Sequence, residues 1–290
     1  MHAPALASAE GIELAAVWGR NAQAAADLAA GHGAAACPDL AALLARVDAV
    51  AFAVPPDVQA PIAARAARAG RHLLLEKPIA ISQAAADGLA EAVAAAGVAS
   101  VVFFTHRFMP DVRAWLADVT ARGGWAGGVS AWFGSSLEGS SPFNTPWRRD
   151  RGALWDIGPH VISLLWAALG PVTSVTADAG PADVAHLILH HRGGATSTAT
   201  VTQSAGAAAA GFEAYLWGDG GRSSAPAGAG DRVAALRTAL AELTANARSG
   251  RADHPCDVSF GRDVGRVVAA AQRQIGRRRA RLAGRRHPEP

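Results

Sequence analysis

The stretch His72-Leu73-Leu74-Leu75-Glu76-Lys77-Pro78 determines how the rest of the chain is interpreted. It forms a short apolar strand that ends at the ammonium group of Lys77, and Pro78 marks a turn directly afterwards. The chain has 27 basic residues, and Lys77 is the only lysine among them. A lysine is a compact ammonium, whereas an arginine is a planar fork that keeps its proton. The lone lysine therefore indicates a site that needs an ammonium; the alternative is a solvated charge in an arginine-biased sequence.

Strands alternate with helices on both sides of this stretch. The pattern predicts strands at 12–17, 48–54, 72–75 and 101–104, and helices at 22–31, 39–45, 59–69 and 82–95. Such alternation is typical of βαβ units and a parallel sheet. Ligands of these sheets bind at the carboxyl ends of the strands. Arg20, the segment 55–57 and the segment 76–78 all follow strands, so together they predict a ligand site.

The pattern changes after about residue 105. A helix is predicted at 110–122, followed by glycine- and threonine-rich strands at 127–134, 172–178, 184–191, 195–204 and 212–217. Their short spacing and turn residues indicate an open, largely antiparallel sheet. Further helices are predicted at 159–169, 230–248 and 261–275. We therefore predict two domains, at 1–104 and 105–276, and a basic, flexible tail at 277–290.

Composition excludes several other classes of protein. Of the 290 residues, 50% are hydrophobic and 18% charged, and no run of about 18 uncharged, strongly apolar residues predicts a membrane span. The first residues lack the basic and apolar regions of a signal peptide. Cys37 and Cys256 lie in different predicted domains, outside any metal-binding pattern. A disulfide stays open, but a reducing cytoplasm fits better.

The net charge of +3 comes from the end of the chain. Residues 277–290 contain six arginines and one glutamate, which leaves 21 basic and 23 acidic residues in 1–276. The body of the protein is therefore no basic nucleic-acid surface, and neither nucleic acid nor a membrane is predicted as a partner. Nucleic-acid binding through the arginine-rich tail is the weaker alternative to a solvated end.

A second motif, GALWDIGPH, occupies residues 152–160. Pro159 suits the first position of a helix, which places His160 in its first turn and Asp156 about one turn away. A helix N-terminus favours a neutral imidazole, and a carboxylate fixes its tautomer. The alternative is a capping Asp beside a core His. Together with Lys77, these side chains suit proton transfer to or from a hydroxyl or carbonyl oxygen; a hydride needs a nicotinamide. No metal site is predicted.

Six segments match one family at the right separations: VPPD at 54–57, AGRHLLLEKP at 69–78, RFMP at 107–110, PWR at 146–148, GALWDIGPH at 152–160 and HPCDVSFG at 254–261. Across residues 2–275 the chain resembles the glucose–fructose oxidoreductase / inositol dehydrogenase (Gfo/Idh/MocA) family of NAD(P)-dependent oxidoreductases. The resemblance implies an α/β fold, with a Rossmann-like parallel-sheet domain followed by an α+β domain. It also implies hydride transfer on a secondary alcohol or ketone of a sugar, cyclitol or nucleotide-sugar.

The resemblance further implies roles for individual residues. Lys77 contacts the nicotinamide ribose and the reacting oxygen, His160 is the general acid/base, and Asp156 holds the substrate or orients the histidine. Pro78 shapes the strand end through an unusual peptide geometry. The implied cofactor-binding residues are Arg20, Asn21, Pro55, Pro56, Asp57, Glu76, Lys77, Pro78, Arg107, Trp147 and Arg148. The second-domain sheet is expected to form a homodimer or homotetramer.

Cofactor choice depends on Arg20-Asn21, which follows the first predicted strand. A site for NAD usually has an acidic residue here, whereas an arginine accommodates the 2′-phosphate of NADP. The sequence therefore predicts NADP, with NAD as the alternative.

The chain departs from the family at its beginning. The family starts with a strand and a Gly-x-Gly-x-x-Gly turn that approaches the pyrophosphate, but this chain has no glycine before Gly11, and residues 1–6 match the helix that follows that turn. We expect a gap in the sheet and weakened cofactor binding. Either Met1 is an internal start of a longer gene, or the chain is a short form that lost its cofactor. The second reading makes it an inactive relic that serves as a binding or assembly protein.

Overall fold

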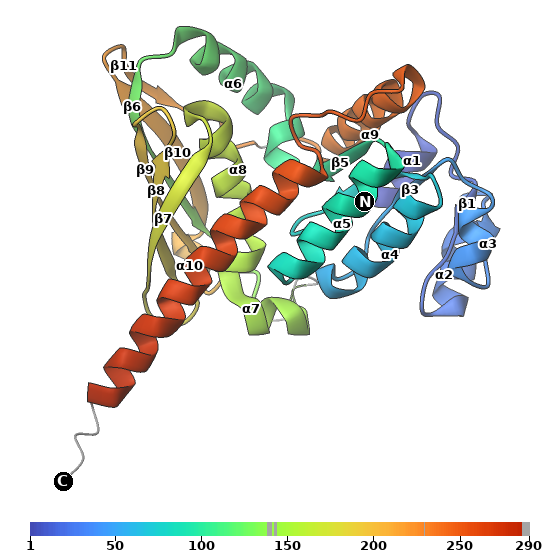
Figure 1. Ribbon diagram of the computed structural model, residues 1–290, viewed down its shortest axis with the longest axis horizontal. Coiled ribbons are helices and arrows are strands. Elements are labelled where there is room, and N and C mark those ends of the chain that lie inside the picture. Colours follow the sequence, from blue (N-terminus) through green and yellow to red (C-terminus); the bar gives the residue numbers. More distant parts are fainter. Residues whose placement is uncertain (138–140, 142–143, 229, 286–290) are drawn as a thin grey trace. The chain divides into compact units, whose positions relative to one another are not determined.

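The computed structural model divides the chain into two units (Figure 1). The structure describes residues 1–285 apart from 138–140, 142–143 and 229. Unit 1 consists of Met1–Met109 and Gly230–Arg262, and unit 2 of Pro110–Ala229 and the chain from Asp263 onward. The first boundary lies close to the predicted one at 104. The predicted second domain, 105–276, is shared between the units because residues 230–262 return to unit 1.

Unit 1 is built on two short parallel sheets. Strand β1 (Ala16–Val17) pairs with β2 (Ala35–Ala36), and β4 (His72–Glu76) lies between β3 (Ala49–Ala51) and β5 (Ser100–Phe103). All these pairs are parallel, as the alternation of elements predicted. The helices of this unit are α1 (His2–Ala7), α2 (Ala22–Ala30), α3 (Leu40–Leu44), α4 (Pro56–Arg68), α5 (Gln83–Ala96), the 3₁₀ turn η1 (Thr105–Phe108) and α9 (Arg232–Ser249).

The two parallel sheets are separate within the described residues. β1 is paired with β2 alone, and β3 with β4 alone. In the usual doubly wound order, 3-2-1-4-5-6, the first strand of the fold lies between the strands that correspond to β1 and β3. The structure therefore has the gap that the sequence predicted. In β3, Val50 is buried and Ala49 is exposed.

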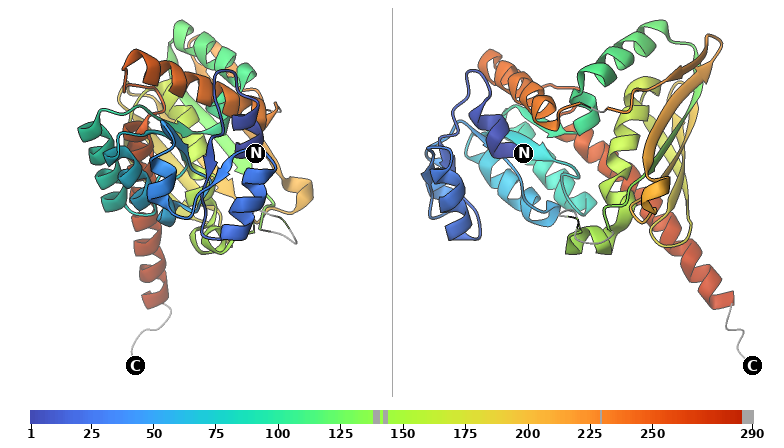
Figure 2. Two further views of the ribbon diagram at one scale, coloured as in Figure 1. Left: turned by 90° about the vertical axis from the view of Figure 1, so that its right-hand side faces the viewer. Right: turned by 180° about the vertical axis from the view of Figure 1, so that it is seen from behind.

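Capping residues determine where these helices begin and end, and the helices pack on an apolar sheet. Asn21 caps α2 by accepting a hydrogen bond from the amide of Ala24 at 3.0 Å. Helix α5 ends at Gly97, whose φ of +64° suits glycine. Figures 1 and 2 show α4 and α5 on one face of the β3-β4-β5 sheet and α1 with α9 on the other. The leucines of β4 between these layers are fully buried, each contributing about 1.5–3 kcal/mol.

Backbone hydrogen bonds explain why the distant segment returns to unit 1. The amide of Val102 in β5 donates to the carbonyl of Cys256 at 2.7 Å. The amide of Val258 donates to the hydroxyl of Ser100 at 3.1 Å. The HPCDVSFG segment thus lies along β5, and residue Phe260 packs edge-on against Phe104 with ring centroids 5.5 Å apart.

Unit 2 contains one six-stranded sheet in the order β11-β10-β6-β9-β8-β7. Neighbouring strands are antiparallel except for the parallel pair β6 and β9. The strands are β6 (Trp125–Phe133), β7 (Val172–Ala179), β8 (Ala185–His191), β9 (Thr196–Thr202), β10 (Gly211–Gly218) and β11 (Gly221–Ser224). The helices are α6 (Pro110–Arg122), α7 (Pro146–Asp156), α8 (Gly158–Leu169), the 3₁₀ turn η2 (Ala207–Ala209) and α10 (Val258–Arg285), which begins in unit 1. The predicted largely antiparallel sheet is confirmed.

Helices cover one face of this sheet. The apolar side of α8 packs on β6 and β9, and Gln274 of α10 bridges to β7 by donating to the carbonyl of Val175 at 2.7 Å and accepting from the amide of Ala177 at 3.0 Å. No helix of the described residues lies over the opposite face (Figure 2). Helix α10 continues through Arg285, so the described part of the predicted tail 277–290 is helical; residues 286–290 lie outside the described residues.

One segment of the described chain, Pro146–Leu169, is long and apolar enough to cross a membrane, with a mean hydropathy of 1.2 in its best window. However, 72% of that window is buried inside the protein. The helical path also breaks at Gly152, where φ is +67° and ψ is −172°. Core helices of water-soluble folds pass the same test, so the segment is weak evidence for a membrane span.

Candidate active site

A buried glutamine of α4 holds the strand end that carries Lys77. The side chain of Gln59 is fully buried, and its Oε1 accepts a hydrogen bond from the amide of Glu76 at 2.8 Å. Its Nε2 donates to the carbonyl of Glu76 at 2.8 Å and to that of Ile79 at 3.3 Å. Gln59 thus satisfies backbone groups on both sides of Lys77, where the chain leaves the sheet. Lys77 itself is half-buried.

The residues around Lys77 follow the ends of two neighbouring strands, β3 and β4. The Lys77–Pro78 peptide bond is cis, which confirms the expected unusual geometry at Pro78. The carboxylate of Glu76 lies 3.2 Å from Nε2 of His2, on α1. Pro56 occupies the first turn of α4, the helix that follows β3 in the chain. Because β3 and β4 are parallel neighbours, the carboxyl ends of these strands lie at the same edge of the sheet.

The remaining predicted residues of unit 1 are exposed at its surface, cap a helix or pack against an aromatic ring. Arg20 is exposed beyond the end of β1, and the side chain of Asn21 is used as the cap of α2. Asp57 is exposed in the first turn of α4, where a negative charge is favourable. Arg107 lies in η1, and its guanidinium carbon is 5.6 Å from the ring centroid of Phe260. That contact gives Arg107 a packing role within unit 1.

In unit 2 the GALWDIGPH segment joins two helices. Gly152 interrupts α7, and a short helical stretch then ends at Asp156. Helix α8 begins at Gly158, with Pro159 in its first turn and His160 beside it. The predicted helix start is therefore confirmed, and the backbone places Asp156 and His160 on consecutive turns. Asp156 is 9% exposed.

Two side chains fix the carboxylate of Asp156. Its Oδ2 accepts from Nε of Arg148 at 2.9 Å and from Nε2 of Gln203 at 2.6 Å. Gln203 is fully buried, and its Oε1 accepts from the hydroxyl of Ser136 at 2.7 Å. Asp156 therefore occupies one defined orientation, because a guanidinium and an amide donate to the same oxygen.

Aromatic rings border this group. The ring of Trp132, on β6, lies 5.4 Å from the imidazole of His160 and 5.3 Å from the ring of Phe212, on β10. The guanidinium carbon of Arg148 is 4.8 Å above the ring of Trp147. An imidazole beside an indole and near a helix N-terminus is held in a partly apolar setting, which suits a ring that exchanges a proton.

Apart from Arg20, Asn21, Asp57 and Arg107, the predicted site residues thus form two groups, one in each unit. Unit 1 groups Lys77 with Glu76, Pro78 and the two prolines after β3; unit 2 groups Asp156 and His160 with Arg148 and Trp147. Sequence analysis missed Gln59, Gln203 and Trp132. Of these three, only Gln59 could have been identified from the sequence, because it is a polar residue on the apolar face of an alanine-rich helix.

The strand ends of unit 1 fit one part of a dinucleotide. The half-buried Lys77 and the half-buried Pro55 suit a nicotinamide riboside, and Arg20 offers a cation at the end of β1. A glycine-rich turn for the pyrophosphate is not among the residues before α2. Within the described residues, no group of three or more His, Cys, Asp or Glu side chains is placed to hold a metal.

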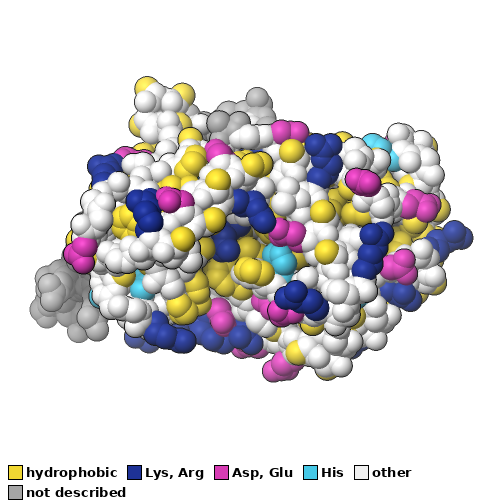
Figure 3. Space-filling model, turned by 90° about the horizontal axis from the view of Figure 1, so that it is seen from above, with side chains coloured by type: hydrophobic (Ala, Val, Ile, Leu, Met, Phe, Trp, Pro, Cys, Tyr) yellow, Lys and Arg dark blue, Asp and Glu magenta, His cyan; other side chains and the backbone are white. Residues whose placement is uncertain are grey.

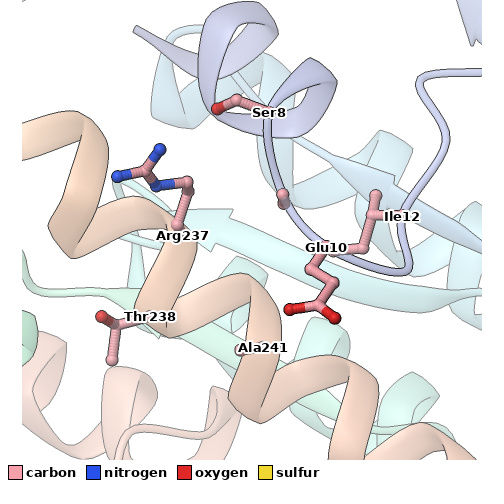
Figure 4. A pocket seen from close by; sticks show the side chains of 7 residues that line it. Ser8, Glu10, Ile12, Arg237, Thr238 and Ala241 are labelled. Carbon is pink, nitrogen blue, oxygen red and sulfur yellow. The ribbon is translucent and has the colours of Figure 1, made fainter.

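A cavity of unit 1 includes none of the predicted site residues. It has a volume of about 360 Å³ and is formed where the turn after α1 meets α9 (Figure 4). Its lining residues are Ser8, Ala9, Glu10, Ile12, Arg237, Thr238 and Ala241. Figure 4 shows the carboxylate of Glu10 and the guanidinium of Arg237 pointing in different directions, so the cavity has no convergent polar groups.

A parallel-sheet domain with an ammonium at a strand end, joined to a mixed-sheet domain with an Asp–His helix start, defines the class of two-domain nicotinamide oxidoreductases. Residues 1–104 match the family model described as "Oxidoreductase family, NAD-binding Rossmann fold", and residues 99–223 match the GFO/IDH/MocA C-terminal domain. The chain belongs to the GFO/IDH/MocA oxidoreductase family.

Individual relatives agree with this assignment. The chain is 32% identical over 136 residues to levoglucosan dehydrogenase of Pseudarthrobacter phenanthrenivorans, covering 44% of this chain and 34% of the relative. It is 42% identical over 77 residues to UDP-N-acetylglucosamine 3-dehydrogenase of Acidithiobacillus ferrooxidans, covering 27% and 25%. These matches thus span about a third or less of each relative's length.

The fold of a solved relative agrees over almost the whole chain. A structure of levoglucosan dehydrogenase in complex with NADH and levoglucosan superposes with a TM-score of 0.80 at 19% identity. The match covers 95% of this chain and 94% of that one. At this identity the likeness shows the fold alone.

Proposed function

We propose that this protein is an NAD(P)-dependent oxidoreductase that acts on a secondary alcohol or ketone of a sugar, cyclitol or nucleotide-sugar. The observation that carries the proposal is the half-buried Lys77 at the carboxyl end of β4, where Gln59 forms hydrogen bonds with the backbone on both sides of it. Two relatives are named as dehydrogenases of a sugar derivative, which supports the substrate class.

The side chains of the two groups supply proton handling. In the oxidation direction, His160 accepts the proton of the substrate hydroxyl, and the hydrogen on the same carbon leaves with its electron pair. Lys77 donates a hydrogen bond to that oxygen while the carbonyl forms. When bound, NAD(P)⁺ would supply the hydride acceptor. The products are a ketone, the reduced cofactor and one proton, which His160 passes to water. Asp156 orients the site through its bonds to Arg148 and Gln203.

The test compares Lys77→Ala and Lys77→Arg with wild type on a panel of sugars, cyclitols and nucleotide-sugars, following NAD(P)H absorbance. We expect both variants to lose at least 100-fold in kcat and to keep their melting temperature, since the arginine restores charge but not the compact ammonium. The exposed Arg46→Ala, also in unit 1, is the control and should leave kcat unchanged. Full activity of Lys77→Ala would reject the assignment.

For the cofactor we propose a preference for NADP over NAD. Arg20 supports it, because an exposed guanidinium after β1 suits a 2′-phosphate. Binding of NADPH and NADH is compared by nucleotide fluorescence in wild type and Arg20→Asp. We expect the substitution to reduce NADPH affinity at least tenfold and to leave NADH affinity equal or higher. Equal affinities in wild type would show that Arg20 does not select the cofactor.

The second candidate is a binding or assembly protein without turnover, in which the separate β1-β2 and β3-β4-β5 sheets hold no dinucleotide. Titration of this chain with NADH and NADPH separates the candidates: a saturable fluorescence change supports the oxidoreductase, and its absence up to millimolar nucleotide supports the binding protein. A chain extended upstream with a strand and a glycine-rich turn serves as the comparison.

We also propose that the uncovered face of the unit 2 sheet forms a homodimer or homotetramer. This face carries the exposed residues Ile188 (41%) and Trp217 (49%). The indole of Trp217 lies over Gly127, where a Cβ would be 2.6 Å from the ring. Light scattering should show an oligomer that Ile188→Glu with Trp217→Glu dissociates, whereas the exposed Leu28→Glu in unit 1 should not. A monomeric wild type would reject the proposal.

The proposal involves small molecules rather than nucleic acid. On the face drawn in Figure 3, basic and acidic side chains are interspersed, and hydrophobic side chains lie between them. Such a surface lacks the single-sign stripe that a nucleic-acid backbone requires.

A further inference from the structure

The turn between β7 and β8 has a strained backbone. Ala182 has a φ of +53°, and it is the one non-glycine residue with a positive φ among the described residues. An L-residue reaches this region at a cost of about 1–2 kcal/mol, so the surrounding contacts must hold the turn in place. The next residue is Asp183.

The carboxylate of Asp183 accepts hydrogen bonds from two other parts of unit 2. Its Oδ2 accepts from the amide of Ala153 at 3.0 Å and from the amide of Gln203 at 3.0 Å. Its Oδ1 accepts from the hydroxyl of Thr202 at 2.6 Å. These donors are neutral, and a carboxylate that accepts several of them is a strong anchor for each.

The first contact fixes the start of the helical stretch that carries Asp156. Gly152 has a φ of +67°, which frees the amide of Ala153 from the preceding turn. Asp183 accepts from that amide much as an N-cap residue does, but from a distant turn. A Cβ on Gly152 would lie 3.2 Å from the Cβ of Asp183, so the close approach also needs a glycine.

The second contact fixes the partner of Asp156. The backbone of Gln203 is bound to Asp183, and the side chain of Gln203 donates to Oδ2 of Asp156 at 2.6 Å. Asp183 therefore binds both the helical stretch that carries Asp156 and the backbone of Gln203, whose side chain orients the Asp156 carboxylate. Loss of either contact frees Asp156 relative to Arg148.

We infer that Asp183 is a positioning residue, which sets the orientation of Asp156 through Ala153 and Gln203. Its importance for catalysis rests on the proposed function, whereas its effect on the position of Asp156 does not.

The experiment uses the full chain with Asp183→Asn, which keeps the size of the side chain but replaces one acceptor oxygen by a donor. The control is Asp219→Asn, which makes the same change in the exposed turn between β10 and β11. Hydrogen exchange by NMR is followed at the amide of Ala153 and the side-chain amide of Gln203. The reference amides are those of Leu187 and Leu189, which are buried within β8.

We expect Asp183→Asn to speed exchange at Ala153 and Gln203 at least tenfold and to leave the reference amides within twofold. In the active enzyme, kcat for the sugar should fall at least tenfold, with the KM for the nucleotide within twofold. Equally faster exchange at all these amides would mean that Asp183 only stabilises unit 2 in general, which contradicts the inference. Unchanged exchange at Ala153 and Gln203 would also overturn it. If wild type shows no turnover, the proposed function fails while exchange still decides the role of Asp183.

Discussion

Gln59→Leu tests whether one buried side chain holds the strand end that carries Lys77. Leucine has nearly the volume of glutamine but neither a donor nor an acceptor. The substitution leaves the amide and the carbonyl of Glu76 without the two 2.8 Å bonds that they now make. Each buried backbone group left unsatisfied costs about 1–3 kcal/mol. The fully buried leucine offsets about 1.5–3 kcal/mol of the total.

The expected net loss is about 2 kcal/mol in the free energy of unfolding of unit 1. For a unit of this size, the melting temperature should fall by roughly 4–8 °C. Differential scanning calorimetry measures the shift. The matched control is Gln23→Leu on α2, where Nε2 donates to Asp27 at 2.8 Å on an exposed surface. Its expected effect is below about 0.5 kcal/mol.

A melting temperature of Gln59→Leu within 2 °C of the Gln23→Leu value would refute the reasoning. It would mean that water or backbone movement satisfies the Glu76 groups without Gln59. Turnover gives a second, independent measure: the variant should lose kcat even at temperatures where it is fully folded, because the loop bearing Lys77 is no longer fixed.

Three further predictions follow from other sites. Gly152→Ala should lower the free energy of unfolding by about 2–4 kcal/mol, because the φ of +67° at this position disfavours a side chain and the added Cβ would meet Asp183. Gly88→Ala in α5, where no atom lies within 4 Å of the added Cβ, is the control and should raise it by up to about 1 kcal/mol. Urea unfolding of both variants measures the two changes. Burial lowers the pKa of His191 from its ordinary value of 6.5, so on acidification the unfolded ring takes up a proton at a higher pH than the folded ring does. The free energy of unfolding should therefore fall as the pH drops below about 6.5. In urea titrations between pH 7.5 and 5, His191→Gln should make the stability less dependent on pH. Substituting Arg148 by Met should lower kcat more than it raises the KM for the sugar, because Asp156 loses the 2.9 Å bond from Nε; initial rates on the best substrate of the panel test this.

The alternation of elements in the first hundred residues was enough to predict the parallel sheet. Leucines in β4 and valines in β5 are buried on both sides, and runs of such residues are typical of parallel strands. The strand 12–17 was predicted too long: only Ala16 and Val17 are paired, because β1 has a partner on one side alone. A pairing that depends on a neighbouring strand cannot be read from local composition.

The return of residues 230–262 to unit 1 was beyond sequence reasoning for a similar reason. Helix α9 was predicted as a helix, but its own sequence does not indicate that it packs on β4 and β5. The candidate site shows the same limit. Lys77, Asp156 and His160 stood out by residue type and spacing, whereas Gln203 became visible only when the fold brought β9 beside α7.

The single lysine has a practical consequence. Apart from the amino terminus, Lys77 Nζ is the sole primary amine of this chain, and residue Lys77 is half-buried at a strand end. Reductive methylation with ¹³C-formaldehyde would therefore label the protein at two nitrogens, and one resonance would report directly on the surroundings of Lys77. The chain thus contains its own spectroscopic reporter, which can follow ligand binding without any engineered probe.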